Sequence, residues 1–192
     1  MLATKMRKLA LPKRKRLWTY DEMVAELEET NQPTELWDGE LMLTPAPAPK
    51  HQTAVLRLGR ALDDFARIRN LGMTYIAPID VVLSQHRVVQ PDIVFVTHAK
   101  KQIIENAIRG VPDLVVEIIS TGSWRRDTIE KRALYEQFGI QEYWIVDPET
   151  ETVEVLTLEH GTYQLLGRFT KNQNAKSKLL KGFRIRVRDI FE

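Results

Sequence analysis

The sequence predicts a mixed α/β fold, in which a mixed β-sheet is flanked by helices and followed by a C-terminal β-hairpin. Three observations predict it. Residues 73–83, 88–96 and 142–147 are rich in β-branched and aromatic side chains, as strands usually are. Residues 50–69 carry apolar side chains at helical spacing. Strand and helix signals alternate in the middle of the chain, which is typical of a sheet covered by helices.

Length and charge indicate one domain with a basic arm. The 192 residues, 43% of them hydrophobic, fit a single globular domain, which we expect at residues 17–192. Residues 1–16 hold seven of the 28 basic residues and no acid, so 21 basic residues remain against 26 acids in the rest. We expect this arm to be flexible, and either to contact a phosphate backbone or to stay solvated.

Composition also excludes several classes of protein. Cysteine is absent, which excludes disulfides, thiolate metal sites and cysteine nucleophiles. No apolar run approaches the roughly 20 residues that span a bilayer, and the basic start lacks the apolar segment of a signal peptide. We therefore expect a soluble, cytoplasmic protein with no membrane partner.

The first elements have clear local signals. Thr19 and Glu22 have the spacing of a capping box, which predicts a short helix after Thr19. Residues 35–43 predict a hairpin, because the Asp38-Gly39 pair readily adopts the positive φ angles of a tight turn. The alternating prolines of residues 45–49 then predict an extended connector.

The helix predicted at residues 50–69 has one apolar stripe. Val55, Leu58, Leu62 and Phe65 lie on it, and His51 lies on the same stripe one turn earlier. His51 should therefore point toward the body of the protein.

Residues 73–83 and 88–96 are predicted to form an antiparallel pair of strands joined by a short turn. Asp92 lies inside the second strand of this pair. Because side chains alternate along a strand, it should share a face with Val94 and Val96.

The second half of the sequence alternates helix and strand. A helical segment is expected at residues 100–108, ending at Gly110, and a strand containing Glu117 follows Pro112. Asp127 resembles a helix cap, and Gly139 is a usual stop for the helix after it. The remaining strands are expected at residues 142–147, at 152–158 and 162–169 as a hairpin, and at 183–187.

Two acids in apolar strands and one lysine stand out chemically. Asp92 and Glu117 are each surrounded by apolar neighbours, and burying an unpaired carboxylate costs several kcal/mol. Lys131 precedes Leu134, Tyr135 and Phe138 by three, four and seven positions, so it lies on the apolar face of its helix. It then either pairs with a carboxylate of the sheet or extends past its helix to solvent.

Such a grouping predicts a divalent-metal site that hydrolyses phosphodiesters. Mg²⁺ is usually held by one or two carboxylates together with water and phosphate oxygens. A nearby lysine can orient the attacking water or offset the growing negative charge.

The sequence resembles the PD-(D/E)XK nuclease superfamily, in particular its bacterial branch of restriction endonucleases of unknown function. The resemblance covers about residues 20–147, with a weaker match in the last strands. The residues that match are Asp38-Gly39-Glu40, the proline-rich stretch before His51, Pro91-Asp92-Ile93-Val94, residues 115–120 around Glu117, Asp127, Lys131, Tyr135 and Gly139, and residues 142–147.

This resemblance implies a restriction-endonuclease-like fold and a set of site residues. It implies that Asp92 and Glu117 ligate Mg²⁺, for which Mn²⁺ can substitute, with the backbone carbonyl of Ile118 as a third ligand. The parent motif has lysine two residues after the second acid, where this sequence has Ile119. Lys131 is similar to the lysine that has migrated to the following helix in some members, and Tyr135 to a helix tyrosine of related nucleases.

Glu40 and His51 are further candidates. In the family an N-terminal acid often joins the metal shell, and Glu40 matches it. The alternative is an exposed hairpin glutamate. His51 could bind a substrate phosphate or a water at the metal, or be a structural residue.

Several other polar residues are better explained structurally. Asp113 lies four residues before Glu117 on one strand, about 13 Å away, which is too far to share an ion. We expect Asp147 to end a strand and Trp144 to lie in the core. His86, His98 and His160 have no metal-ligand spacing.

We therefore expect a Mg²⁺-dependent endonuclease that cleaves DNA, with Asp92 and Glu117 holding the ion and Lys131 positioning the attacking water. Tyr135, Glu40 and His51 support substrate or water, and the resemblance makes a homodimer plausible. A nuclease-derived module without catalysis, which binds nucleic acid or protein, is the alternative that Ile119 and the acidic body motivate. A nuclease directed at RNA is a third.

Overall fold

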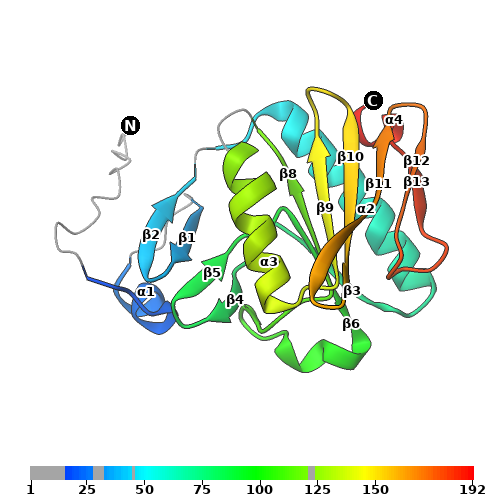
Figure 1. Cartoon of the computed structure of the whole chain (residues 1–192). Coiled ribbons are helices and arrows are strands. Elements are labelled where there is room, and N and C mark those ends of the chain that lie inside the picture. Colours follow the sequence, from blue (N-terminus) through cyan, green and yellow to red (C-terminus); the bar gives the residue numbers. More distant parts are fainter. Residues whose placement is uncertain (1–15, 28–32, 45, 121–123) are drawn as a thin grey trace, which may run out of the picture.

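The computed structural model describes residues 16–27, 33–44, 46–120 and 124–192, so most of the basic arm predicted at residues 1–16 lies outside the described residues. The fold combines a six-stranded sheet, a five-stranded sheet and a separate two-stranded hairpin (Figure 1). This is the mixed α/β architecture, with helices flanking a mixed sheet, that the sequence predicts.

The six-stranded sheet is the centre of the molecule. Its strand order is β11-β10-β9-β8-β6-β3, in which β8 and β9 are parallel and the other neighbours are antiparallel. The strands are β3 (Gly72–Ile76), β6 (Ile93–Thr97), β8 (Leu114–Ile118), β9 (Glu142–Asp147), β10 (Thr152–Glu159) and β11 (Thr162–Thr170).

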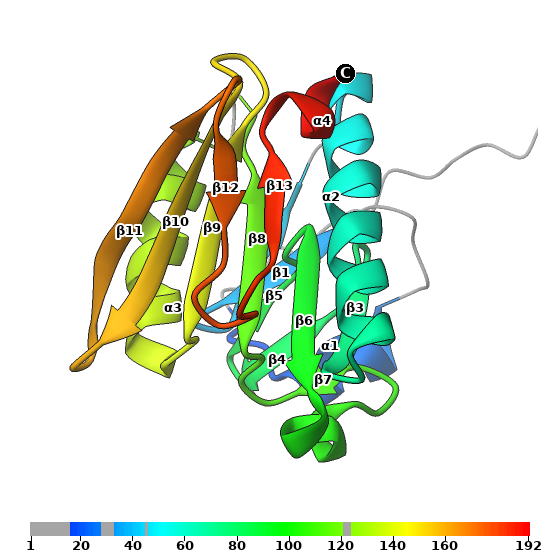
Figure 2. The same ribbon diagram turned by 90° about the vertical axis from the view of Figure 1, so that its right-hand side faces the viewer.

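Two helices cover opposite faces of this sheet, as Figures 1 and 2 show. Alternate residues of β8 point to each side: Leu114, Val116 and Ile118 pack in the core that α2 (Pro49–Ile68) covers. Val115 packs with α3 (Arg132–Phe138) on the other side. Because side chains alternate along a strand, Glu117 faces α3 as well.

The five-stranded sheet packs beside the first and carries the N-terminal elements. Its order is β2-β1-β5-β4-β7, and α1 (Tyr20–Glu26) packs on it around the buried Leu36 and Val88. The capping box of Thr19 and Glu22 is present as predicted. The strands are β1 (Thr34–Trp37), β2 (Glu40–Leu43), β4 (Val81–Ser84), β5 (Arg87–Val89) and β7 (Ile108–Arg109).

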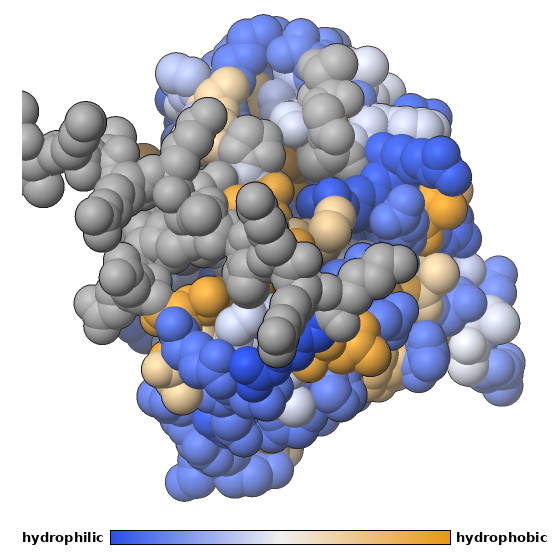
Figure 3. Space-filling view, turned by 90° about the vertical axis from the view of Figure 1, so that its left-hand side faces the viewer, coloured by the Kyte–Doolittle hydropathy of each residue, from blue (hydrophilic) through white to orange (hydrophobic). Residues whose placement is uncertain are grey.

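The hairpin predicted at residues 35–43 is confirmed. β1 and β2 pair antiparallel, and Asp38 and Gly39 turn between them with φ of 49° and 81°. On the side of the molecule that carries this hairpin, the surface is largely hydrophilic, with separate hydrophobic patches (Figure 3).

The two long strands predicted at residues 73–83 and 88–96 are each divided in two. Their antiparallel pairing is correct, but β3 pairs with β6 in the larger sheet and β4 with β5 in the smaller one. Pro78 and Pro91 lie at the divisions, where a residue without an N–H cannot continue a ladder. Asp92 consequently lies directly before β6 and not inside a strand.

The helix predicted at residues 100–108 is also wrong in extent. A 3₁₀ helix, η1 (His98–Ile103), occupies part of it, and β7 then pairs parallel with β4. Burial of Ala107 and Ile108 in the core outweighs the helical tendency of the segment.

The helix that carries Lys131 begins earlier than predicted. The chain is helical from residue 124, so Asp127 lies within the helix and does not cap it. A π-helical segment, η2 (Arg126–Lys131), precedes α3. As predicted, the helix ends at Gly139, whose φ is 82°.

The C-terminal hairpin is confirmed, and a second small one follows. β10 and β11 are joined through His160 and Gly161, with φ of 51° and 81°. β13 (Arg184–Arg186) falls within the predicted last strand and pairs with β12 (Asn174–Lys176), which the sequence did not predict; α4 (Arg188–Phe191) follows. Among the described residues, no helix is both long and apolar enough to cross a membrane.

Candidate active site

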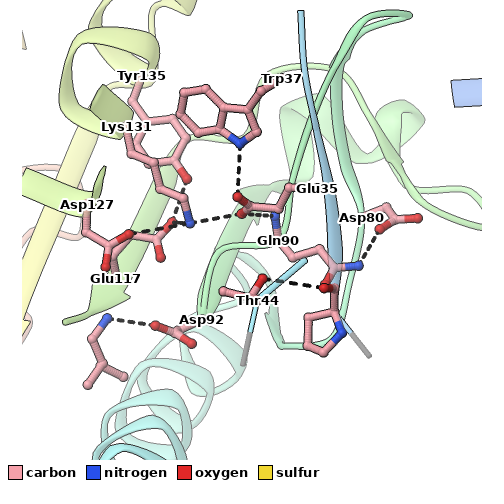
Figure 4. Close-up of polar contacts among 12 residues, drawn as sticks. Glu35, Trp37, Thr44, Asp80, Gln90, Asp92, Glu117, Asp127, Lys131 and Tyr135 are labelled. Carbon is pink, nitrogen blue, oxygen red and sulfur yellow. Dashed lines mark hydrogen bonds and ion pairs between the residues drawn. The ribbon is translucent and has the colours of Figure 1, made fainter. Parts of the chain in front are cut away.

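A buried ion-pair cluster lies between the two sheets, at the helix that covers β8. Lys131 is at its centre, with only 5% of its surface exposed. Its Nζ lies 2.9 Å from Glu117 Oε1, 3.0 Å from Glu35 Oε1 and 3.7 Å from Asp127 Oδ1 (Figure 4). The lysine therefore pairs with carboxylates and does not extend to solvent.

The charge of this lysine is strongly favoured. Burial acts to lower the pKa of Lys131, but the carboxylates of Glu117, Glu35 and Asp127 together raise it well above its ordinary value. The amine is therefore protonated at neutral pH.

Glu117 receives two donors on the same oxygen. The Lys131 amine and the Tyr135 hydroxyl, at 2.6 Å, both donate to Oε1. Burial is the main cause that raises the pKa of Glu117 well above its ordinary value, and the nearby acids Asp127, Asp92 and Glu35 add to it, against the lowering effect of Lys131. The site thus holds more negative charge than its single lysine neutralises.

Glu35 is the residue that sequence reasoning missed. It reaches the cluster from β1, where its Oε2 accepts from Trp37 Nε1 at 3.0 Å and its Oε1 from the Gln90 backbone N–H at 3.0 Å. Burial acts to raise the pKa of Glu35, but Lys131 and these donors lower it below its ordinary value. Glu35 shares the sequence feature that singled out Asp92 and Glu117, which is an acid with apolar neighbours in a strand.

Asp92 and His51 form the more open part of the site. The Ile118 backbone N–H donates to Asp92 Oδ2 at 2.7 Å, and His51 Nε2 lies 3.2 Å from the same oxygen. The side chains of His51 and Asp92 are 13% and 15% exposed. Burial acts to lower the pKa of His51, but Asp92 raises it, with smaller contributions from Asp127 and the Ile118 backbone.

The strand register brings the two predicted metal ligands together. Ile93 is opposite Val116 in the β6–β8 ladder, so extending the register by one residue places Asp92 opposite Glu117. Directly opposite residues have Cβ atoms about 5 Å apart and point to the same face. This register, together with the hydrogen bond from the Ile118 N–H to Asp92, places the two side chains near each other on one face.

The donor set fits a hard divalent cation. Among the contacts within the described residues, Glu117 uses only Oε1 and Asp92 only Oδ2, which leaves one oxygen on each. No group of three or more His, Cys, Asp or Glu side chains in the described part of the chain is arranged to hold a metal. Mg²⁺ needs fewer, because one or two carboxylates are its usual protein ligands. Asp92, Glu117 and the Ile118 carbonyl are the residues that would hold it.

Comparison with protein families identifies the group. A family model, Uma2, described as "Putative restriction endonuclease", matches residues 19–188. The chain belongs to the Uma2 family. The match spans both sheets and every residue of the cluster described above.

A solved structure shows the same fold. It is described as "Crystal structure of a putative nuclease belonging to DUF820 from Anabaena variabilis ATCC 29413", and it superposes with a TM-score of 0.73 at 19% sequence identity. The match covers 90% of this chain and 97% of that one. Among curated protein sequences, none matches. Family and structure together confirm the predicted resemblance and the restriction-endonuclease-like fold.

In this Uma2 member the structure brings together most, but not all, of the predicted site residues. Lys131 and Tyr135 both contact Glu117, and His51 contacts Asp92. The backbone N–H of Ile118, the residue after Glu117, donates to Asp92 and links the two groups. Glu40 is not part of this network: it is exposed at the start of β2, beside the hairpin turn. The opposite strand of the same hairpin supplies Glu35 in its place.

The polar residues set aside in the sequence have structural partners. Asp113 accepts from the Thr97 backbone N–H and pairs with Lys100 at 3.0 Å. Asp147 accepts from Glu149 and Thr150 in the turn after β9, and Trp144 is fully buried. These contacts explain both acids without a catalytic role.

Proposed function

We propose that this protein is a divalent-metal-dependent endonuclease that hydrolyses DNA phosphodiester bonds, with Mg²⁺ as the natural ion and Mn²⁺ as a substitute. The observation that supports it most is the pair Asp92 and Glu117 beside a buried lysine: the β6–β8 register brings them together, and each keeps one oxygen without a contact among the described residues. The family description and the fold of the solved neighbour support nuclease chemistry in general.

In this proposal Asp92 and Glu117 hold the cation, and their hydrogen-bond partners fix the orientation of the two carboxylates. A cation bound here would neutralise negative charge on the phosphate and lower the pKa of a coordinated water. Tyr135 and Lys131 hold Glu117 in one orientation, which leaves its second oxygen for the ion. The Ile118 N–H and His51 fix Asp92 in the same way.

Lys131 contributes a positive charge close to the reacting phosphate. Glu117 and Glu35 lie within hydrogen-bond distance of its amine and Asp127 lies at 3.7 Å, so an attacking water would compete with these carboxylates and could exchange with one of them. Binding of a divalent cation would favour that exchange, since Glu117 would then share its charge with the ion. We propose that the exchange is how Lys131 positions the water.

The Glu117→Gln variant tests the proposal. The amide keeps the shape of the side chain but loses the charge that binds the cation, and Lys131 keeps Glu35 as a partner at 3.0 Å. We expect Mg²⁺-dependent cleavage of single-stranded, duplex and branched DNA to be abolished while the circular dichroism spectrum is unchanged. Cleavage at the wild-type rate would contradict the assignment. Parallel cleavage assays on RNA test whether DNA, rather than RNA, is the substrate.

A second candidate function keeps the fold without catalysis. It is a module that binds nucleic acid or protein, and it is favoured by Ile119 at the family's lysine position and by the full set of carboxylate partners around Lys131. Such a module would not need a divalent cation. A homodimer is proposed for either function, and sedimentation velocity would test it.

A further inference from the structure

One tryptophan differs from the other three in its surroundings. Trp18 and Trp144 are buried and Trp37 is partly buried, but Trp124 is 54% exposed. Ile129, in the same helical segment, is also 54% exposed. Exposed apolar side chains are ordinary one by one, so the surroundings of this pair decide whether it has a function.

Trp124 and Ile129 line a concave pocket of about 330 Å³. Its other apolar lining comes from Ile119, which follows β8, and Ile145 on β9. Arg132 also lines it. Pockets of this size can hold small organic groups, and the lining here mixes apolar with polar side chains.

The lining combines flat apolar surface with charged side chains of both signs, Arg132 and Arg168 with Asp147 and Glu154. Arg168, also in the lining, pairs with Glu154 at 3.3 Å, whereas no ion pair of Arg132 occurs among the described residues. Glu154 is thus paired, and Asp147 accepts hydrogen bonds from the turn after β9, which leaves Arg132 for a ligand. A nucleotide matches Trp124 and Arg132, because its base stacks on an aromatic ring and its phosphate pairs with a guanidinium. A purely apolar ligand would leave Arg132 unused.

The pocket and the candidate active site lie on two flanks of the same helix. Asp127 and Lys131 face the carboxylate cluster, while the residues that follow each of them, Thr128 and Arg132, line the pocket. At the end of β8 the arrangement is the same, since Ile118 donates to Asp92 and Ile119 lines the pocket. The pocket and the site are therefore adjacent and separated by this one helix.

We infer that this pocket stacks an unpaired base of the strand that the site cleaves, which makes single-stranded or branched nucleic acid the preferred substrate. In a continuous duplex the bases are stacked on one another and unavailable to Trp124. The free energy needed to unstack a base is smallest when that base is unpaired. The inference rests on the proposed function for its substrate strand, but base binding is measurable without cleavage.

Fluorescence titration tests it directly, because Trp124 is the most exposed of the four tryptophans. A single-stranded oligonucleotide of about 12 nucleotides, added in EDTA, should quench the emission. Trp124→Phe should remove most of the quenching but keep most of the affinity. Measured by anisotropy, Trp124→Ala should weaken binding about 5- to 150-fold, the range expected for loss of one base–aromatic stack.

The controls separate stacking from general effects. Leu56→Ala removes an apolar side chain that is 63% exposed on α2, outside the pocket, and should leave affinity unchanged. Affinity for a duplex of the same sequence should change little in Trp124→Ala. The inference would be overturned if Trp124→Ala lost equal affinity for single strand and duplex, or if the wild type showed no quenching. It would also be overturned if Trp124→Ala changed the oligomeric state but not the DNA affinity.

Failure of this inference is distinguishable from failure of the proposed function. Base binding is measured without metal, so Glu117→Gln should still show the quenching of Trp124 by the single strand. If Glu117→Gln still cleaves, the proposed function is wrong whatever the quenching shows. If quenching is absent while Glu117→Gln abolishes cleavage, only the pocket is misassigned.

Discussion

The two halves of the candidate site differ sharply in their exposure to solvent. Glu35, Glu117 and Lys131 are 2–5% exposed and pair with one another, whereas the side chains of His51 and Asp92 are 13% and 15% exposed. Charges in the first half cannot be hydrated, so each depends on its partner. The second half is where an ion, a water or a phosphate can enter. The buried half should therefore contribute more to stability, and the open half gives solvent its access to the site.

The buried half also joins the two sheets. Glu35 belongs to the five-stranded sheet and Glu117 to the six-stranded one, and the single amine of Lys131 contacts both. Removing Lys131 should therefore affect the whole fold, while changes at His51 should be milder.

Among variants that test this difference between the two halves, Lys131→Met should change the free energy of unfolding most. Methionine keeps the apolar stem but leaves Glu35, Glu117 and Asp127 without their buried cation, which typically costs about 3–5 kcal/mol of unfolding free energy. Urea denaturation measures the loss. It should be smaller at acidic pH, because Glu117, with its raised pKa, then takes up a proton.

Lys178→Met is the matched control for Lys131→Met. Lys178 pairs with Glu159 at 2.7 Å, but its side chain is 57% exposed. Its replacement should cost less than about 1 kcal/mol. Equal losses in the two variants would contradict the division into a buried and an open half.

A smaller effect should distinguish the two glutamates of the β1–β2 hairpin. Both oxygens of Glu35 accept hydrogen bonds, from Trp37, Gln90 and Lys131, and the amide of Glu35→Gln cannot accept on its nitrogen. We expect a loss of roughly 1.5–3 kcal/mol in thermal or urea unfolding. Glu40→Gln, on the exposed strand, should stay within about 0.5 kcal/mol of wild type. The reverse order would make Glu40 the N-terminal member of the site.

The smallest effect concerns His51 and depends on pH. Its pKa is raised in the folded protein, so its stabilising contribution is complete below its ordinary value and is lost as pH rises through the folded pKa. In EDTA, the stability difference between wild type and His51→Gln should thus be larger at about pH 5.5 than at about pH 8.5. His160→Gln, in an exposed turn, serves as control. A difference that grows toward alkaline pH would be inconsistent with the His51–Asp92 pair.

Local patterns predicted much of this molecule from the sequence. The spacing of apolar residues located the helix of His51 and the strands of Glu117 and Trp144. The capping box located the first helix, and the Asp38-Gly39 turn located the first hairpin. The apolar stripe was enough to place Lys131 and Tyr135 toward the sheet. These features depend on residues close together in the chain.

The features that the sequence did not predict depend on distant pairing. Glu35 reaches Lys131 because β1 pairs with β5, about 50 residues later, which no local pattern shows. Asp127 joins the cluster because the helix starts earlier and widens into a π-helical segment. The split of the long strands follows from the presence of two sheets, each of which pairs one part of each strand.

Calorimetric titration with Mn²⁺ tests the central claim, that Asp92 and Glu117 hold one divalent cation, most directly. The wild type should bind one ion per chain, and Asp92→Asn and Glu117→Gln should each lose that binding while remaining folded. Lys178→Met, far from the site, should bind as the wild type does. A wild-type protein that binds no Mn²⁺, or variants that bind it unchanged, would contradict the account and favour the module without catalysis.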